Sequence, residues 1–264
     1  MQIVTTSDGI NIHYELTGDS SKPVLLFSNS LGNNKSMWDE QEKAFANVFQ
    51  ILRYDTRGHG ESDAPKGAYV LERLGQDVVE LINGLKLKTV HFCGLSLGGM
   101  TGMWLGMNAA DRLESLTLCC TAAHLSPEDL WNARIEQVIS MGMGSITETV
   151  LGRWFTPSFL KKDSSMVSSV RHQLLTTSAD GYAGCCAAIK YMDFRDGLAT
   201  IDKPCLVISG REDKATPPEH GKQIAAGIAG SKYKEIPDAA HLSNIEQAEI
   251  FNQYVMEFLI QFTD

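Results

Sequence analysis

Short apolar runs alternate with helix-length segments over most of the chain, and this alternation limits the fold more strongly than any other feature of the sequence. The runs that predict buried strands are residues 23–30, 50–55, 89–96, 113–120, 204–210 and 232–237. The segments that predict helices between them are residues 72–85, 100–109, 218–229 and 246–262. Alternating β and α units predict an α/β fold, with a mostly parallel central sheet and helices on both faces. The first residues instead predict two short strands joined at Asp8-Gly9.

The alternation stops between residues 124 and 195, where the sequence has helical patterns and no convincing strand. One helix is expected to have Ser126 as its N-cap and Pro127 at its first helical position, with acidic residues in the first turn. A helical insertion after a strand predicts a cap over the carboxyl edge of the sheet, where ligands bind in open α/β sheets. We therefore expect a core of residues 1–123 and 196–264 and a helical cap, or lid, of residues 124–195.

The net charge and hydropathy of the 264-residue chain exclude several classes of function. A formal charge of −9, with no basic cluster to offset it, argues against a nucleic-acid partner. No apolar run approaches the length of a membrane span and the N-terminus lacks a signal-peptide pattern, so we expect a cytoplasmic protein without a membrane partner. The six cysteines have no CxxC spacing and predict buried free thiols, with no metal or other cofactor. The sequence leaves the oligomeric state open.

The sequence GLSLG at residues 94–98 is the strongest candidate for a catalytic motif. It follows a predicted strand and opens a helix at about Leu97, the strand–turn–helix setting in which a serine becomes an exposed nucleophile. The sharp turn is expected to strain Ser96, while Gly94 and Gly98 leave room for the strand and the helix to approach. A glycine-rich turn with an idle serine is the alternative.

Two backbone amides are expected to stabilise negative charge on a carbonyl oxygen that Ser96 attacks. The Leu97 N–H would lie at a helix N-terminus, where amides are unpaired and the partial charge is positive. The Leu31 N–H is the second candidate, in the loop NSLGNN after a predicted strand, with Gly32 keeping the loop tight. A plain turn is the alternative interpretation of this loop.

A serine nucleophile needs a base and an orienting acid, and both are expected after later strands. Asp213 and His241 each follow a predicted strand, so both would emerge at the same edge of the sheet, with Asp213 accepting from one ring nitrogen and the other facing Ser96. The carboxylates weighed against Asp213 are Glu212, Asp238, Asp193 and Asp196. The remaining histidines, which lack this context, are His13, His59, His91, His124, His172 and His220. Among them only His124, at the start of the cap, is weighed as a substrate contact.

The segment RYDTRGHGES carries Asp55, Arg57 and His59 directly after a strand. A catalytic role is one interpretation. We favour a buried polar brace, in which Arg57 pairs with a carboxylate beneath the pocket and His59 is structural or lines the pocket.

These motifs resemble those of the α/β-hydrolase superfamily, and within it the chain is similar to the 3-oxoadipate enol-lactonases. The similarity runs nearly from end to end. The stretches that carry it are NSLG with MWDEQ, RYDTRGHGES, GLSLGGMTGMWLG, CTAAHLSPEDLWNARI, RWFTP, GYAGCCAAI, ATPPEHG and DAAHLSNIEQ. The stretches from the predicted cap are the more specific ones. The chain departs from the family in having Cys120 before TAA and a highly charged GREDKA stretch, which leave the exact substrate open.

The resemblance implies a serine hydrolase that acts on carboxylic ester bonds, with Ser96, Asp213 and His241 as its catalytic triad. It further implies hydrolysis of 3-oxoadipate enol-lactone to 3-oxoadipate, in the β-ketoadipate pathway of aromatic compound catabolism, through an acyl-enzyme and without a cofactor. The alternatives are a general carboxylesterase, a C–C bond hydrolase of the same fold and a non-catalytic ligand receptor.

The expected partner is therefore a small anionic lactone, and in a chain of charge −9 its carboxylate needs a local cation. Arg134 is the first candidate, and Trp131, one turn before it, is expected to wall the pocket. Trp154 and Arg153 are further substrate-binding candidates. The alternative is that Arg134 is a solvated residue on the cap surface.

Overall fold

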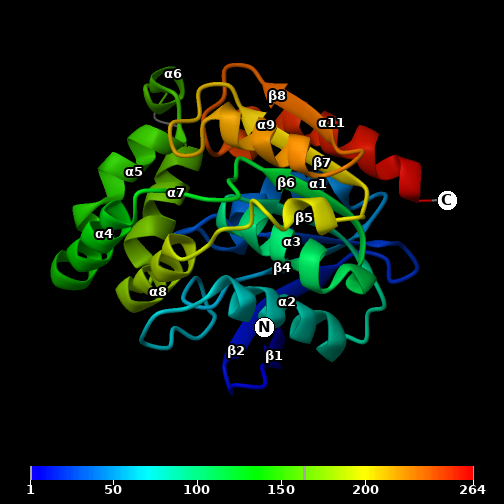
Figure 1. Ribbon diagram of the computed structural model, residues 1–264, viewed down its shortest axis with the longest axis horizontal. Helices are drawn as coiled ribbons and strands as arrows, with labels where there is room; N and C mark the ends of the chain where they lie inside the picture. The colour runs from blue at the N-terminus through cyan, green and yellow to red at the C-terminus, as the bar shows by residue number, and fades with distance from the viewer. Residues whose placement is uncertain (1, 163–164, 264) are drawn as a thin grey trace.

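One sheet runs through the protein and positions the site. The computed structural model describes residues 2–162 and 165–263, and within these residues the sheet has eight strands (Figure 1). They are β1 (Gln2–Thr5), β2 (Asn11–Thr17), β3 (Val24–Ser28), β4 (Gln50–Tyr54), β5 (Val90–Leu95), β6 (Leu113–Cys119), β7 (Cys205–Gly210) and β8 (Lys232–Ile236). Their order across the sheet is β1-β2-β4-β3-β5-β6-β7-β8. Each of the six runs predicted as a strand contains one of them. The prediction that residues 232–237 form a buried strand was wrong, because β8 lies at the edge of the sheet and only its Ile236 is buried.

The pairing of the strands confirms a mostly parallel sheet. From β4 to β8 every neighbouring pair is parallel. The first two strands form the predicted antiparallel hairpin, and β2 also pairs antiparallel with β4. In the hairpin turn the Gly9 N–H donates to the Thr6 carbonyl at 2.9 Å. Since β4 and β5 lie on opposite sides of β3, the chain changes direction there, and in open α/β sheets ligands bind at such a point.

Helices cover both faces of this sheet, as the alternation predicts. Outside residues 124–195, the described helices are α1 (Asp39–Phe45), α2 (Leu71–Gly84), α3 (Leu97–Asn108), α9 (Pro218–Gly227), α10 (Ser243–Glu246) and α11 (Ala248–Leu259), with the short 3-10 helices η1 (Lys35–Trp38), η2 (Ala110–Arg112), η4 (Leu198–Thr200) and η5 (Ile260–Phe262). Figure 1 shows α2, α3 and α9 in front of the sheet and α1 and α11 behind it. The helix predicted at 246–262 is interrupted, because Gln247 leaves the helical conformation and separates α10 from α11.

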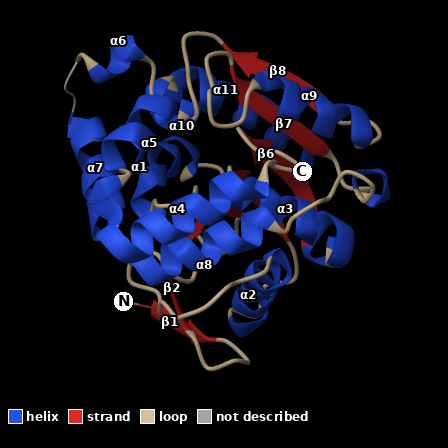
Figure 2. Ribbon diagram, turned by 60° about the vertical axis from the view of Figure 1, so that its left-hand side comes forward, coloured by secondary structure: helices blue, strands red, loops and turns tan. Residues whose placement is uncertain are grey.

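The segment between β6 and β7 forms a group of helices at one side of the molecule (Figure 1). Its described helices are α4 (Glu128–Met141), η3 (Met143–Ser145), α5 (Thr147–Trp154), α6 (Pro157–Leu160), α7 (Ser165–Thr176) and α8 (Ala179–Lys190). Figure 2 shows α4 and α8 packed side by side. Both ends of the segment meet, because His124 forms an antiparallel β-bridge with Asp193. The division of the chain into a core and a cap of residues 124–195 stays a prediction.

The start of α4 differs from the prediction. Pro127, and not Ser126, is the N-cap, so the helix begins at Glu128. Pro127 has a ψ angle of 158°, which is an extended conformation, and the first helical residue must therefore follow it. The expected Ser126 cap was wrong by one residue.

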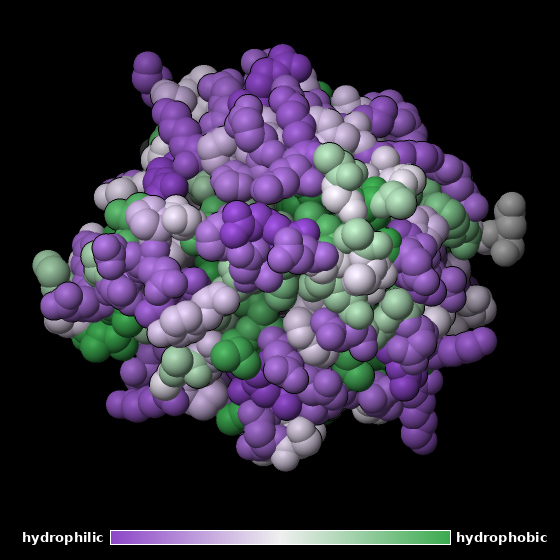
Figure 3. Space-filling view, in the orientation of Figure 1, coloured by the Kyte–Doolittle hydropathy of each residue, from purple (hydrophilic) through white to green (hydrophobic). Residues whose placement is uncertain are grey.

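The core of the protein lies where the strands meet the helices. Every residue of β3, β4, β5 and β7 is buried, as expected for strands covered on both faces. All six cysteines are buried and free, which confirms the expectation from their spacing. Hydrophilic side chains cover most of the face in Figure 3, with smaller hydrophobic areas between them. No helix in the described ranges combines the length and the apolar character needed to cross a bilayer.

Candidate active site

Ser96 sits on the sharp turn between β5 and α3. Its backbone has φ 58° and ψ −113°, a strained combination for a residue with a side chain. Three hydrogen bonds hold it there: the Ser96 N–H donates to the Cys119 carbonyl at 2.9 Å, and the Ser96 carbonyl accepts from the Met100 amide at 3.0 Å and the Thr121 hydroxyl at 2.7 Å. The turn is therefore rigid, as predicted.

The two glycines of the motif are required by close backbone contacts. A Cβ on Gly94 would lie 2.2 Å from the Gly98 carbonyl oxygen, and a Cβ on Gly98 would lie 2.2 Å from the Ser28 carbonyl oxygen. Neither distance is compatible with a side chain. Both glycines let β3, β5 and α3 converge beneath Ser96.

The loop after β3 brings the predicted Leu31 amide to the same place. The turn from Ser30 to Asn33 is closed by the Asn33 N–H, which donates to the Ser30 carbonyl at 3.1 Å, and Gly32 at its third position has φ 84°. The Gly32 N–H donates to His59 Nε2 at 2.8 Å. Burial lowers the pKa of His59 to about 4, so the ring is neutral and its Nε2 remains an acceptor. His59 is thus structural, and it fixes the loop that carries Leu31.

Both predicted oxyanion donors have free N–H groups. Among residues 2–162 and 165–263, neither the Leu31 nor the Leu97 amide has a hydrogen-bond acceptor. Leu97 is the first residue of α3, where the helix dipole adds a partial positive charge. Leu31 and Ser96 line one cavity.

Asp213 and His241 are brought together by the loops after β7 and β8. His241 Nδ1 lies 2.7 Å from Asp213 Oδ2, and both side chains are buried. The loop itself orients the carboxylate, because Asp213 Oδ1 accepts from the amides of Ala215 and Thr216 at 2.7 and 2.9 Å, and Oδ2 accepts from the Thr216 hydroxyl at 2.8 Å. A proton on Nδ1 that is held by Asp213 leaves His241 Nε2 unprotonated, which is the form in which a histidine can accept a proton.

Trp154, at the end of α5, connects the helices between β6 and β7 to this histidine. Its indole stacks on the His241 ring, with centroids 6.2 Å apart and planes at 24°. The backbones are also joined, because the Leu242 N–H donates to the Trp154 carbonyl at 3.1 Å. Trp154 therefore packs beside His241 and lines the cavity.

Glu246 is a buried carboxylate that ties the same two segments together. Its Oε2 accepts from the Ala240 amide at 2.9 Å, next to His241, and its Oε1 accepts from the Thr156 amide at 3.1 Å and from the Thr156 hydroxyl. Burial raises the pKa of Glu246, although these hydrogen bonds oppose the shift. Glu246 holds the chain after α5 against the histidine loop.

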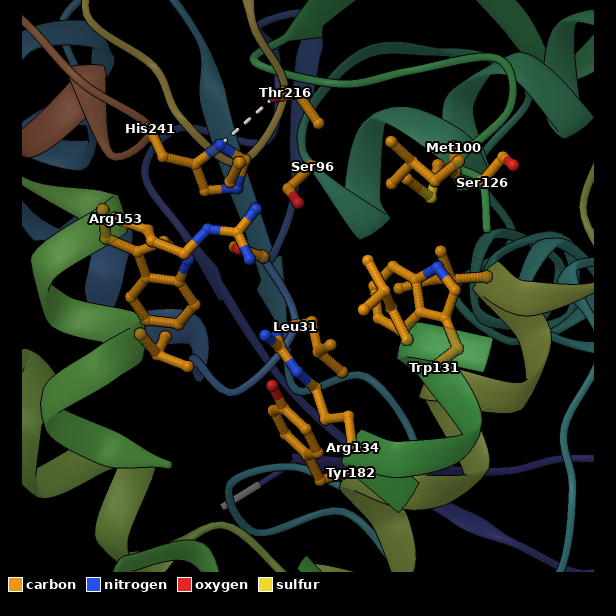
Figure 4. Close-up of a pocket in the computed structure, with 17 residues that line it drawn as sticks. Leu31, Ser96, Met100, Ser126, Trp131, Arg134, Arg153, Tyr182, Thr216 and His241 are labelled. Carbon is orange, nitrogen blue, oxygen red and sulfur yellow. Dashed lines mark hydrogen bonds between the residues drawn. The ribbon is translucent and has the colours of Figure 1, made fainter. Parts of the chain in front are cut away.

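A cavity of about 140 Å³ opens above Ser96 (Figure 4). It is bounded by the core loops on one side and by α4, α5 and α8 on the other. The residues that line it are Ser30, Leu31, Ser96, Met100, Leu125, Ser126, Leu130, Trp131, Arg134, Val150, Arg153, Trp154, Tyr182, Ile189, Ala215, Thr216 and His241. All the predicted site residues line this cavity except Asp213 and Leu97. Asp213 contacts the lining residue His241, and Leu97 directly follows the lining residue Ser96.

Two guanidinium groups enter the cavity. Figure 4 shows the Arg134 guanidinium beside the Tyr182 hydroxyl and the Arg153 guanidinium directed toward Ser96 and His241. Within the part of the chain that the structure describes, no carboxylate pairs with either arginine. Burial, and then the charge of Arg134, lower the pKa of Arg153. The repulsion between two unpaired cations favours an anionic ligand.

The polar segment after β4 forms a brace, as favoured from the sequence. Arg57 Nε and Nη2 donate to the two oxygens of Asp77 at 2.5 and 2.6 Å, and Nη1 donates to Asp8 at 2.9 Å. Asp55 accepts from the Lys35 amide at 2.7 Å. These residues do not line the cavity.

None of the other carboxylates and histidines weighed as partners of Ser96 lines the cavity. Glu212 is exposed, Asp238 occupies a turn with φ 52°, and Asp193 pairs with Arg195. His91 is buried beside Ser115, and the His124 ring faces the Met192 carbonyl instead of the cavity. No cluster of side chains that could hold a metal ion occurs in the described residues.

Sequence reasoning did not identify Thr216, Tyr182 or Glu246. Thr216 had a local signal, since a threonine three residues after an aspartate often hydrogen-bonds back to it. Tyr182 and Glu246 had none: the cavity around Tyr182 is built from distant segments, and Thr156, which donates to Glu246, lies 90 positions away.

Comparison with known proteins agrees with this geometry. The family model described as alpha/beta hydrolase fold matches residues 23–248. A 3-oxoadipate enol-lactonase of Acinetobacter baylyi is 38% identical over 257 residues, which cover 97% of this chain and 96% of that protein. The crystal structure of a hydrolase from Pseudomonas aeruginosa is 43% identical, with a TM-score of 0.96 over 98% of this chain and 97% of that one. The structure of an enol-lactonase from Burkholderia xenovorans is 41% identical, with a TM-score of 0.95 over 98% of this chain and all of that one. The chain therefore belongs to the alpha/beta hydrolases and, among them, to the 3-oxoadipate enol-lactonases, a family of ester-hydrolysing enzymes.

Proposed function

We propose that the protein hydrolyses 3-oxoadipate enol-lactone to 3-oxoadipate, a step of the β-ketoadipate pathway, through an acyl-enzyme on Ser96. The observation that carries this proposal is that two kinds of group meet at one cavity. These are Ser96 with the His241–Asp213 pair, and two arginines that have no carboxylate partner among the described residues. A lactone that carries a carboxylate matches both. The names of the related enzymes support the same substrate.

In the acylation half-reaction His241 Nε2 takes the proton of the Ser96 hydroxyl. A bond forms between Ser96 Oγ and the lactone carbonyl carbon, and the carbonyl oxygen becomes an oxyanion held by the amides of Leu31 and Leu97. When the intermediate collapses, the ring C–O bond breaks and an enolate leaves. The enolate takes the proton from His241 and becomes the ketone.

In the deacylation half-reaction His241 takes a proton from water, and the oxygen of that water attacks the acyl carbon on Ser96. The ester bond breaks, and Ser96 recovers its proton from His241. The acyl carbon becomes the second carboxylate of 3-oxoadipate, and the remaining proton of the water passes to solvent. Throughout both half-reactions Asp213 holds the proton on His241 Nδ1, and it stabilises the imidazolium that forms when Nε2 is also protonated.

We assign the substrate carboxylate to Arg134. Its guanidinium lies in the cavity and has no carboxylate partner in the described ranges. It is flanked by the Tyr182 hydroxyl and by Trp131, whose ring lies 5.8 Å from Arg134 Cζ. Trp131 and Trp154 both line the cavity and supply apolar surface for the lactone ring.

The test compares the enol-lactone with a neutral ester in the Arg134→Ala variant. We expect kcat/KM for the lactone to fall about 100-fold, mainly through KM, because a charged pair in a cavity is worth about 3 kcal/mol. The neutral ester should be unaffected, and Arg112→Ala, a change on the distant helix η2, serves as the control. An equal loss on both substrates would rule out this role for Arg134.

Substrate profiling and a binding measurement with the lactone separate the alternative functions. A general carboxylesterase would prefer neutral esters to the lactone, and a C–C bond hydrolase would cleave diketones. A ligand receptor would bind the lactone without turning it over.

A further inference from the structure

The cavity holds more positive charge than the substrate carboxylate needs. Arg134 and Arg153 both line it, and neither has a carboxylate partner in the described ranges. An enol-lactone carries one carboxylate, so one guanidinium remains for a charge that arises during the reaction.

The surroundings of the two arginines differ in a way that assigns them different tasks. Arg134 lies on α4, beside the Tyr182 hydroxyl (Figure 4). Arg153 precedes Trp154, which stacks on the His241 ring, and Arg153 Nη2 donates to the Lys214 carbonyl at 3.0 Å, one residue after Asp213. This hydrogen bond holds Arg153 on the side of the cavity where His241 lies.

Only part of the Arg153 hydrogen-bonding capacity is used by that contact. A guanidinium has five N–H groups, and the bond to Lys214 engages one of them. Figure 4 shows the rest of the group directed toward Ser96 and His241. A donor held there faces the leaving oxygen of an ester attacked by Ser96, because that oxygen must also lie within reach of the base.

We propose that Arg153 is a catalytic residue that stabilises the enolate released when the lactone ring opens. This role rests on the proposed function. In the step concerned, the electron pair of the breaking ring C–O bond passes to the ring oxygen, whose negative charge Arg153 neutralises by hydrogen bonding. The proton that His241 took from Ser96 then passes to the enolate, and Arg153 itself neither gains nor loses a proton.

The test is a series of aryl acetates with leaving groups from 4-nitrophenol to phenol. These esters carry no carboxylate, and their kcat/KM reports the acylation step. We expect Arg153→Gln to lose roughly 10-fold more kcat/KM on phenyl acetate than on 4-nitrophenyl acetate, because the poorer leaving group depends more on the cation. The conservative Arg153→Lys should recover part of this loss.

The matched control is Arg134→Gln, which should leave the dependence on leaving group unchanged and raise KM for the enol-lactone instead. A uniform loss across the series in Arg153→Gln, with unfolding temperatures equal to wild type, would overturn the role of Arg153. The aryl acetates do not depend on the identity of the natural substrate. If the wild-type protein rejects the enol-lactone, the proposed function fails, while the leaving-group series still decides what Arg153 does.

Discussion

Replacing Glu246 by glutamine tests whether the contact between the histidine loop and the chain after α5 positions His241, the proposed base. The carboxylate accepts from the Ala240 amide at 2.9 Å and from the amide and hydroxyl of Thr156. Glutamine has one acceptor oxygen, and its NH₂ group would face one of these N–H donors. A buried N–H that loses its acceptor costs about 1–3 kcal/mol, and removing an unpaired buried charge offsets a part of this.

We therefore expect Glu246→Gln to lower the free energy of unfolding by about 2 kcal/mol. For a chain of this size that corresponds to a fall of about 4–8 °C in Tm. The kcat of the folded variant should fall roughly 10-fold at 25 °C, because Ala240 directly precedes His241 and small displacements of a base are costly. Thermal unfolding followed by circular dichroism and hydrolysis of 4-nitrophenyl acetate measure the two effects.

Two variants of Thr156 complete this experiment. Thr156→Ser keeps both donors and should behave as wild type. Thr156→Val loses the hydroxyl that donates to Glu246 and also caps α6, so its Tm should fall about as far as that of Glu246→Gln. A lower Tm with an unchanged kcat would refute the positioning role and leave Glu246 a purely structural residue. An unchanged Tm and kcat would refute the energetic reasoning as well.

Two further predictions concern the turns beneath the site. Gly98→Ala places a Cβ 2.2 Å from the Ser28 carbonyl oxygen. We expect the free energy of unfolding, measured in urea, to fall by about 1–3 kcal/mol and kcat to fall with it. Wild-type stability and kcat would show that β3 and α3 separate easily. Burial lowers the pKa of His59 from 6.5 to about 4, so the unfolded chain binds the proton more readily than the folded protein. The free energy of unfolding should therefore fall by up to about 3 kcal/mol as the pH falls from 6.5 to 4. His59→Gln should lack this part of the pH dependence, and parallel stability curves for the two proteins would contradict it.

The sheet and the positions of the triad residues were predictable because they follow from local patterns. Each buried strand is a continuous apolar run, and parallel strands present their carboxyl ends at one edge. Ser96 and Asp213 closely follow buried strands, so their placement required no knowledge of distant contacts. His241 follows β8, in which only Ile236 is buried, so its position was predictable from the direction of the strand alone. The pairing of His241 with Asp213 agrees with that expectation.

What the sequence could not show depends on contacts between distant segments. Glu246 and Thr156 are 90 positions apart, and no local pattern connects them. The break at Gln247 has no glycine or proline to mark it, and it falls directly after Glu246, whose side chain is directed inward. The start of α4 was predicted one residue early, because a Ser-Pro-Glu pattern fits a helix that begins at either Pro127 or Glu128.

The most direct test of the proposed reaction is the loss of enol-lactone absorbance catalysed by the wild-type protein and by Ser96→Ala. In the proposed mechanism Ser96 supplies the attacking oxygen. We therefore expect rapid loss with wild type and a kcat lower by several powers of ten in the variant, with an unchanged unfolding temperature. A wild-type protein that binds the lactone without consuming it, or a Ser96→Ala variant with near wild-type kcat, would contradict an acyl-enzyme on Ser96.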